Sequence, residues 1–401
     1  MKETYAVIGA GPLGNCAARA LAEELESQSR PARIYLVDAN DPLKQEFGNM
    51  SASGPHAAGH LMLHVFDPES PAKDLTRRSH ELLKGMQEEG AIDLHSRPWI
   101  CCTGNSSSEL DKTAQDVLAQ SYSEGRLENC ELVKGVDIPE TNGLRPDQVA
   151  WAVLDPTTMA VNPRVFVQQL TERAVQHPYV EPLFNTRVIR CTHNKIETEC
   201  DGTLTERPIS GVILCTGIHR DLFSDALPDG RPEYLHVTEH KSDQHTPEVM
   251  NLITGETTIA RYAGFGPQRK RVTPLLPNDV LEYGIHGLLT DVPGLRRMLD
   301  SHFDNPDTAI ATGHFVWPLL TETIGRYVQP EMLLGHAAST LTANQTYVSA
   351  YNKLLDSDGP FLHQLEVDLP TVYVQPSNGL GLNQCAALAA DAASLLAEIL
   401  G

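Results

Sequence analysis

Three histidines stand four residues apart in the segment SASGPHAAGHLMLH, at positions 56, 60 and 64. Residues four apart share one face of a helix, and imidazole is a common metal ligand. On a helix, however, His56 and His64 would lie about 12 Å apart, which is too far for one metal ion to bridge. We therefore expect no metal site here. We expect the histidines to begin a helix that carries Gly59, with Leu61 and Leu63 packing inward.

A glycine-rich motif near the N-terminus predicts a phosphate-binding turn. The sequence TYAVIGAGPLG, residues 4–14, has a β-type run over 5–8, the spacing Gly-x-Gly-x-x-Gly, and then the helical segment NCAARALAEELE. The first glycine permits a tight turn, the second lets a pyrophosphate approach the backbone, and the third lets helix and strand pack closely. A helix that starts with proline then offers free N–H groups to a phosphate. The predicted contacts are Gly9, Gly11, Pro12, Leu13 and Gly14.

An acidic residue follows the motif at the distance typical of dinucleotide sites. The segment ARIYLVDAND predicts a second strand that ends in Asp38, twenty-four positions beyond Gly14. A carboxylate there accepts hydrogen bonds from the hydroxyls of an adenosine ribose. The same negative charge disfavours a 2′-phosphate, so NADP is not expected at this site.

Two distant segments return to this nucleotide region. The segments 185–191 and 209–220 predict two strands, the second ending in Thr216 and Gly217. Near the C-terminus, LPTVYVQPSNGLGLNQCAALAADAASLLAEIL predicts a strand, a turn with Gly379 and Gly381, and a long Ala/Leu-rich helix. A simple NAD dehydrogenase does not bring its last strand and helix back in this way.

The chain resembles the FAD-dependent amine and amino-acid oxidase family that includes D-amino-acid, glycine and sarcosine oxidases. The matching blocks are AVIGAGPLG…VDA, SASGPHAAG, VNPRVFVQQLTERAV…NTRV, GVILCTG and VQPSNGLGLNQCAALAADAASLLAEIL. Within that family, ASGPHAAGHLMLH is similar to the FAD module of the bifunctional enzymes that mature 5-aminomethyl-type wobble uridines in transfer RNA.

The resemblance implies FAD as cofactor and assigns further residues to it. A small-residue loop would cover the flavin and pyrophosphate, a strand would meet the adenine through its backbone, and a strand end would lie beside the dinucleotide. The N-terminus of the last helix would stabilise negative charge at the pyrimidine end of the reduced flavin. The implied residues of the loop are Ala52, Ser53 and Gly54, and Val188 is the implied adenine contact. Thr216 and Gly217 are the implied strand end, and the implied residues at the start of the last helix are Asn378, Gly379, Leu380, Gly381 and Leu382.

The family reaction moves a hydride from the carbon beside an amine to flavin N5, giving an imine that water hydrolyses. No second glycine triplet for NAD(P)H is present, because Arg269 stands where the third glycine after Gly264-x-Gly266 would be. The chain lacks the CxxC pair that a disulfide reductase would need. It also lacks the Gly-Asp dipeptide that is typical of flavin enzymes that hydroxylate aromatic rings. We expect the substrate itself to reduce the flavin. The electron acceptor, dioxygen or another, stays open.

The substrate pocket departs from the family pattern. Members that act on free amino acids carry an arginine clamp for the α-carboxylate, but Trp317 precedes Pro318 where that arginine is expected. Either the clamp has moved, to Arg326, Arg269 or Arg271, or the substrate differs. Trp317 could stack on a planar ring or be a core residue, and the basic segment 262–271 could bind an anion or be a solvated hairpin. The candidate catalytic residues are His56, His60, Tyr262, Arg269 and Trp317.

The predicted fold is α/β: a Rossmann-like FAD-binding domain of the glutathione-reductase type, interleaved with an α+β substrate domain that has a mixed or antiparallel sheet. The FAD-binding domain is predicted to comprise residues 1–80, 150–225 and 340–401. The substrate domain is predicted to comprise residues 81–149 and 226–339.

Composition limits the partners. The net charge of −21 opposes non-specific binding to nucleic acid or anionic membranes. There is no apolar run long enough to span a bilayer and no signal-peptide pattern, and the eight scattered cysteines are typical of a reduced, cytoplasmic setting.

The expected function is oxidation of the C–N bond of an amine or amino acid, either glycine-type or an N-substituted glycine. The substrate could also be a glycine adduct on a pyrimidine nucleotide, including one within nucleic acid. The alternatives are a flavin-dependent lyase or monooxygenase, or a nucleotide-binding protein without turnover.

Overall fold

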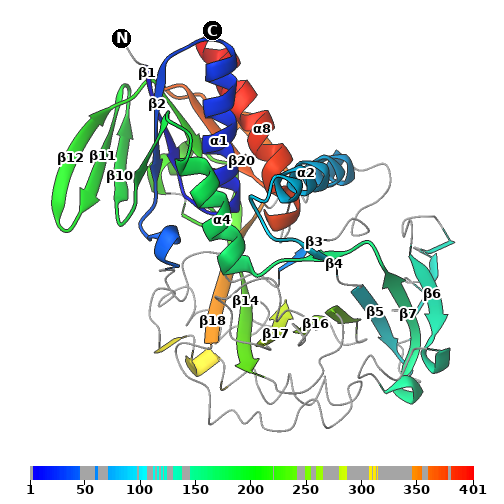
Figure 1. The fold of residues 1–401 in the computed structure, drawn as a ribbon. Helices are drawn as coiled ribbons and strands as arrows, with labels where there is room; N and C mark the ends of the chain where they lie inside the picture. The colour runs from blue at the N-terminus through cyan, green and yellow to red at the C-terminus, as the bar shows by residue number, and fades with distance from the viewer. Residues whose placement is uncertain are drawn as a thin grey trace.

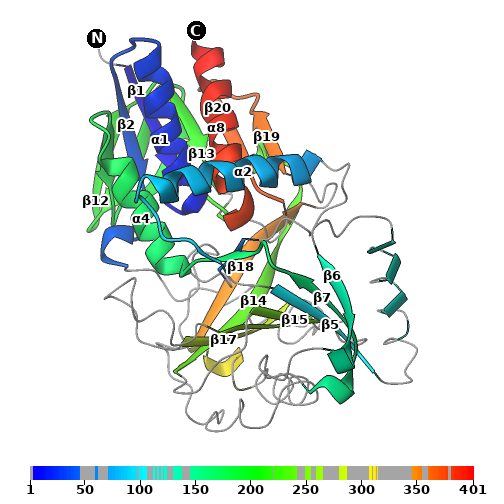
Figure 2. The ribbon, with the colours of Figure 1, turned by 45° about the vertical axis from the view of Figure 1, so that its right-hand side comes forward.

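The computed structural model contains two main β-sheets, one with six strands and one with eight (Figures 1 and 2). The structure describes residues 3–45, 59–61, 71–96, 99–105, 130–137, 145–219, 221–241, 249–253, 259–264, 280–286, 346–354, 360–377 and 381–401, with single positions between 112 and 123 and between 307 and 314. No helix in these residues has the length and apolar character needed to cross a membrane.

The six-stranded sheet has the order β19-β20-β13-β1-β2-β9. Its strands run parallel except for β19, which pairs antiparallel with β20 at one edge. Central strands such as β13 and β20 are buried along their whole length, as expected for parallel strands covered on both faces. The strands are β1 (Glu3–Ile8), β2 (Ala32–Val37), β9 (Val180–Leu183), β13 (Gly211–Leu214), β19 (Phe361–Gln364) and β20 (Thr371–Gln375).

Different layers cover the two faces of this sheet. Tyr5 and Val7 of β1 belong to a core formed with the helices, whereas Ala6 and Ile8 belong to a core on the other face, because successive strand residues point to opposite sides. That second face is covered by a three-stranded antiparallel sheet, which extends from the body in Figure 1. Its strands are β10 (Arg187–Thr192), β11 (Lys195–Cys200) and β12 (Thr203–Pro208).

The helix layer contains α1 and α8 side by side, with α2 crossing near them (Figures 1 and 2). Alanines on the facing sides of α1 and α8 allow this close packing, and both helices contribute to the larger core. The helices are α1 (Pro12–Ser27), α2 (Pro71–Glu88), α4 (Pro163–Val175) and α8 (Gly381–Leu400). Short 3₁₀ turns cover Pro42–Lys44, Gly135–Asp137, Pro146–Gln148 and Asp221–Ala226.

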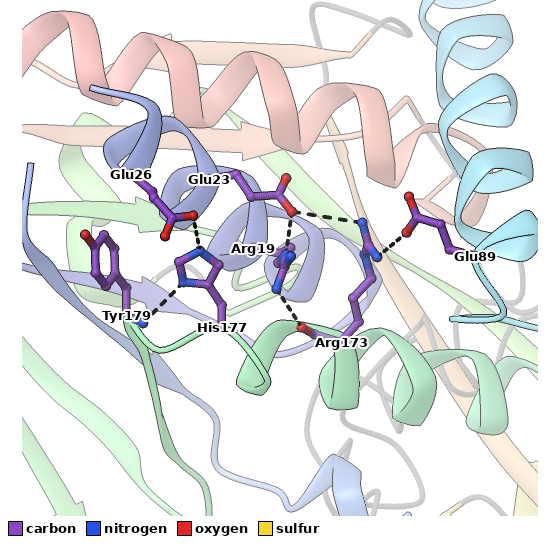
Figure 3. A network of polar contacts seen from close by, with 7 residues as sticks. All are labelled: Arg19, Glu23, Glu26, Glu89, Arg173, His177 and Tyr179. Atoms are coloured by element: carbon purple, nitrogen blue, oxygen red, sulfur yellow. Dashed lines mark hydrogen bonds and ion pairs between the residues drawn. The ribbon is translucent and has the colours of Figure 1, made fainter. Parts of the chain in front are cut away.

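A polar network joins the C-terminal half of α1 to α4 and to the end of α2 (Figure 3). Arg173 of α4 lies 2.6 Å from a carboxylate oxygen of Glu89 and 4.0 Å from one of Glu23. His177 follows α4, and its Nε2 lies 3.4 Å from the Glu26 carboxylate. The carboxylates are half exposed or more, so each pair contributes little on its own. The network fixes this side of the helix layer without approaching the carboxyl ends of the strands.

The second sheet has the order β18-β14-β17-β16-β15-β5-β7-β6. It is mixed, as predicted, because β15 pairs parallel with β5 and the other pairs are antiparallel. Its strands are β5 (Trp99–Gly104), β6 (Glu131–Lys134), β7 (Val149–Asp155), β14 (Gly230–Lys241), β15 (Val249–Ile253), β16 (Ile259–Gly264), β17 (Val280–His286) and β18 (Thr346–Leu354).

The strand partners bear on the predicted domain ranges. All of β18, and all of β7 except its first residue, lie in ranges predicted to belong to the FAD-binding domain, but both strands pair in the eight-stranded sheet. Such long-range pairing is not encoded in the local pattern of a strand, which is why the sequence placed these two segments differently. The division of the chain as a whole stays a prediction.

The helix predicted to begin at the histidine segment is wrong where the structure describes it. His60 and Leu61 form the strand β3 (His60–Leu61), which pairs with β8 (Met159–Ala160), the partner also of β4 (His95–Ser96). Gly59 has a φ of +69°, and a Cβ there would lie 2.2 Å from the carbonyl oxygen of Val161. A left-handed, tightly packed glycine ends any helix at this point. Leu61 is buried, as expected. The segments 51–58 and 62–64 lie outside the described residues.

Candidate functional site

The turns that follow three neighbouring parallel strands lie together at one edge of the six-stranded sheet. The N–H of Gly9, after β1, donates to the carbonyl of Val37 at the end of β2 (2.8 Å). The N–H of Cys215, after β13, donates to the carbonyl of Ile8 (2.9 Å). Ligands of open α/β sheets bind at the carboxyl ends of the strands, so this edge is the candidate site.

Two glycines of the motif are required by the protein itself. Gly9 has a φ of +100°, and a Cβ there would lie 2.4 Å from the carbonyl oxygen of Cys215. A Cβ on Gly14 would lie 1.7 Å from the carbonyl oxygen of Gly9. A Cβ on Gly11, by contrast, would meet nothing within 4 Å. Gly11 therefore leaves the outer side of the turn open to a ligand.

The first turn of α1 is available to an anion. Gly11 is the N-cap in an extended conformation, no side chain caps the helix, and Pro12 stands in the first turn. The Asn15 side chain donates to the carbonyl of Ala10 (2.6 Å), which holds the preceding turn in place. Uncapped N–H groups at the positive end of a helix favour a phosphate. The turn thus fits the pyrophosphate of a dinucleotide.

The Asp38 carboxylate has protein donors and room for more. Its Oδ2 accepts the N–H of Ala10 (2.6 Å), and its Oδ1 accepts the backbone N–H of Asn40 (2.8 Å) and the Asn40 side-chain amide (3.2 Å). Desolvation raises the pKa of this carboxyl above its usual range, although the N–H donors act in the opposite direction. The residue keeps part of its surface exposed. An ionised carboxylate accepts about four hydrogen bonds, so an acceptor position is left for a ribose hydroxyl.

Val188 and the turn after β13 lie close to these groups. The N–H of Thr186 donates to the carbonyl of Asp38 (2.9 Å), which places the start of β10 beside the acidic residue. The strand predicted to end in Thr216 and Gly217 ends earlier, at Leu214. Gly217 has a left-handed φ of +59°, far from extended backbone, and Thr216 and Gly217 lie in the turn beyond the strand.

The last helix starts at the same edge. β20 runs parallel to β13 and ends at Gln375, and α8 begins at Gly381 with Leu382 buried behind it. The elements predicted to bind FAD from the two ends of the chain are thus brought together. Six of the predicted cofactor residues lie outside the described part of the chain: Ala52, Ser53, Gly54, Asn378, Gly379 and Leu380.

The predicted catalytic residues are only in part described. His60 lies in the small sheet with β8, and Tyr262 lies in β16, paired with Met250 and Tyr283 on the neighbouring strands. His56, Arg269 and Trp317 lie outside the described residues. Their roles stay predictions. No group of three or more potential metal ligands occurs in the residues that the structure describes.

Buried thiols near the glycine turn are poor nucleophiles. Burial raises the pKa of the Cys215 thiol, and a hydrogen bond with Cys16 together with burial raises that of Cys385. Because the thiolate is the reactive form of cysteine, these residues act as packing groups here.

Sequence reasoning missed a buried polar cluster at the start of α8. It joins α8 to α2 and to the turn after β20, and consists of Thr76, Ser79, His80, Ser377, Asn383 and Gln384, each at most 3% exposed. The signal was present as the adjacent pair Asn383-Gln384 in a helix that is otherwise rich in Ala and Leu.

Comparison with solved structures supports the fold. Glycine oxidase from Geobacillus kaustophilus is similar with a TM-score of 0.70 and 13% identity, over 99% of this chain and 95% of that one. L-proline dehydrogenase from P. horikoshii gives 0.66 and 14%, over 99% and 94%. L-α-glycerophosphate oxidase from Mycoplasma pneumoniae, with FAD bound, gives 0.62 and 15%, over 99% and 95%. A search of curated protein sequences found no significant match.

The sequence profile of the DAO family, described as FAD dependent oxidoreductase, matches residues 4–265. This range includes the glycine turn, Asp38, β10 and β13. It covers more than half of the 401 residues. The chain therefore belongs to the DAO family of FAD-dependent oxidoreductases.

Proposed function

We propose that this chain oxidises the C–N bond of an amine or amino acid, of the glycine or N-substituted glycine type. When bound, FAD accepts the hydride from the carbon beside the nitrogen. The nitrogen loses a proton, the resulting imine takes up water, and the C–N bond breaks to give a carbonyl compound and an amine. The observation that carries the proposal is the family match over residues 4–265 on a site whose free helix end and acidic residue fit a dinucleotide.

The chain's own residues have separate tasks in this proposal. Gly11 and the first turn of α1 bind the pyrophosphate, and Asp38 binds the ribose. His56, His60, Tyr262, Arg269 and Trp317 are proposed to orient the substrate amine and its carboxylate. Because Trp317 stands before Pro318 where the family arginine is expected, either Arg269, Arg271 or Arg326 binds the carboxylate or the substrate is not a simple free amino acid. A glycine adduct on a pyrimidine nucleotide, free or within nucleic acid, is the extended form of the proposal, and dioxygen or another acceptor would reoxidise the flavin.

A second reaction class is kept in the test because one similar structure is a glycerophosphate oxidase, whose substrate by its name is not an amine. Oxidation of a C–O bond uses the same hydride acceptor. A lyase or monooxygenase reaction is the other alternative. If the enzyme oxidises a C–O bond, or is a lyase or monooxygenase, an amine is not expected to bleach the flavin.

The deciding experiment mixes FAD-loaded protein anaerobically, without NAD(P)H, with glycine, sarcosine, L-proline, a glycine-modified uridine or α-glycerophosphate. We expect an N-substituted glycine to bleach the oxidised-flavin absorbance and to yield the carbonyl product. Bleaching by dithionite but by no amine would refute the proposal, and bleaching by α-glycerophosphate alone would establish C–O oxidation.

A variant pair tests the pocket. Tyr262→Phe is expected to slow bleaching at least tenfold, whereas Tyr122→Phe, at a tyrosine that is 41% exposed, should leave it unchanged.

Retention of the protein on RNA tests whether the substrate is part of a nucleic acid. Salt-sensitive retention would favour a substrate within nucleic acid, and no retention would favour the free nucleotide or a small amine.

A further inference from the structure

α1 and α8 begin at the same edge of the sheet. β1, β13 and β20 are parallel, so the helices that follow β1 and β20 both start at the carboxyl ends of the strands. The two helices then run side by side (Figure 1). Each presents the positive end of its dipole to the dinucleotide edge. The position of the first turn of α8 therefore matters for any charge that develops there.

One side chain joins that first turn to the segment before it. Oε1 of Gln384 accepts the backbone N–H of Ser377 (2.7 Å), and its Nε2 donates to Oγ of the same serine (3.0 Å). These two hydrogen bonds join the first turn of α8 to Ser377, which lies two residues after the end of β20. Both residues are at most 2% exposed, so water cannot replace these bonds.

The same amide also holds α8 to α2. Nε2 of Gln384 lies 3.3 Å from Oγ1 of Thr76 and 3.4 Å from the carbonyl of Ala72. One turn further along α2, Ser79 accepts the backbone N–H of Ala386 at 3.1 Å. These contacts all lie in the first two turns of α8, and α2 thereby supports the end of α8 that meets the cofactor edge.

His80 completes the cluster as a neutral group. Its Nε2 lies 3.2 Å from Oδ1 of Asn383, and its Nδ1 has no hydrogen-bond partner among the described residues. Burial lowers the pKa of His80 to about 4. The cluster therefore adds no ionised side chain of its own at neutral pH, and what it supplies is position.

We propose that Gln384 is a positioning residue that fixes the first turn of α8 against Ser377 and α2, and through that helix start sets how strongly the protein favours reduced over oxidised FAD. The inference rests on the family cofactor and on the sequence prediction that the N-terminus of the last helix meets the pyrimidine end of the flavin. It does not depend on the substrate being an amine. If Gln384 is lost, the N–H groups at the start of α8 are held less firmly and stabilise negative charge on the reduced ring less well.

The test measures the midpoint potential of the bound flavin by equilibration with redox dyes, without any amine, so the outcome is independent of the proposed reaction. Gln384→Met keeps the length of the side chain and removes its hydrogen bonds. We expect about a tenfold loss in the preference for reduced over oxidised FAD, which for a two-electron couple is a fall of about 30 mV. Ser377→Ala removes one of the two bonds to this serine and should shift the potential in the same direction by less.

The matched control is Asp391→Asn, which breaks the ion pair with Arg78 between the same two helices. Asp391 lies about 15 Å further along α8 than Gly381, so its loss should lower the melting temperature without moving the potential. An unchanged potential in Gln384→Met would overturn the proposal and make the cluster a packing feature only. If Gln384→Met does not fold, Ser377→Ala decides by the same criterion, read against Asp391→Asn.

Discussion

Two helices of this protein begin alike in sequence but differently in structure. Both α1 and α4 have proline in their first turn. At α4, the side chain of Asn162 accepts the backbone N–H groups of Arg164 and Val165, each at 3.0 Å. At α1, the corresponding position is Gly11, which has no side chain to cap the helix. The end of α4 is therefore satisfied by the protein, whereas the end of α1 is left for a ligand.

The difference separates stability from binding. A side-chain cap contributes about 1 kcal/mol to stability, and α1 forgoes that contribution until a phosphate occupies its first turn. Changes around α1 should therefore alter FAD affinity, while changes at the cap of α4 should alter only stability. Four substitutions test this contrast.

Gly14→Ala should have the largest effect, because the new Cβ would lie 1.7 Å from the carbonyl oxygen of Gly9. Neither backbone segment can move without displacing the other, and we expect a loss of about 3 kcal/mol or more in unfolding free energy, together with loss of FAD binding. Thermal unfolding and flavin fluorescence measure the two effects. Gly85→Ala in α2 is the control, since its Cβ meets nothing within 4 Å and alanine favours a helix. A stable, yellow Gly14→Ala protein would contradict the packing of the turn.

Gly11→Ser should separate the two effects. The position has an extended backbone with φ −69° and ψ −177°, which serine adopts readily, and a Cβ there is free of contacts. Serine can cap α1 as Asn162 caps α4, so the protein without FAD should keep its melting temperature or gain slightly. FAD affinity should fall about a hundredfold, because the side chain occupies the approach of the pyrophosphate. Unchanged affinity in a fluorescence titration would show that the phosphate does not approach this end of α1.

Asp38→Asn should weaken FAD binding by about tenfold to a hundredfold, the range expected for hydrogen bonds to a charged group. Ribose hydroxyls donate to the ionised carboxylate and so lower its pKa, which desolvation has raised in the free protein. Binding is therefore strongest above that raised pKa and weakens as the pH falls through it.

Titrations of FAD across the acidic range measure this dependence, with Asp38→Asn as the reference for every other titrating group. The variant should lack the part of the slope that belongs to Asp38. Identical pH profiles for the two proteins would show that this carboxylate does not contact the cofactor.

The part of the site that could be predicted from the sequence is the part encoded by residues close together in the chain. The glycine spacing, the apolar runs of β1 and β2 and the position of Asp38 are all encoded within forty residues, and the structure places them in one turn region. A motif that depends on sterics between near neighbours can be interpreted without tertiary information. The dinucleotide site followed from it, whereas the family and FAD came from a resemblance that also includes segments 185–191, 209–220 and the C-terminal block.

The features that sequence reasoning predicted wrongly or missed depend on contacts between residues far apart in the chain. The periodicity of the histidines suggested a helix, but Gly59 is held by Val161, about a hundred residues away. β18 joins the larger sheet through β14, which the pattern of either strand alone could not show. The polar cluster of Gln384 likewise depends on α2, more than three hundred residues earlier. In each case the local conformation is set by a segment of the same chain that lies far away in the sequence.

Asn162→Ala should have the smallest effect and completes the contrast between the two helices. The substitution removes both hydrogen bonds to the first turn of α4 and should cost about 1 kcal/mol in unfolding free energy. FAD affinity should be unchanged, because α4 is satisfied within the protein and does not begin at the glycine turn. Denaturant unfolding and a FAD titration on the same sample measure both quantities. A loss of FAD affinity comparable to that of Gly11→Ser would mean that the start of α4 also supports the cofactor site, and that the contrast between a closed and an open helix end does not hold.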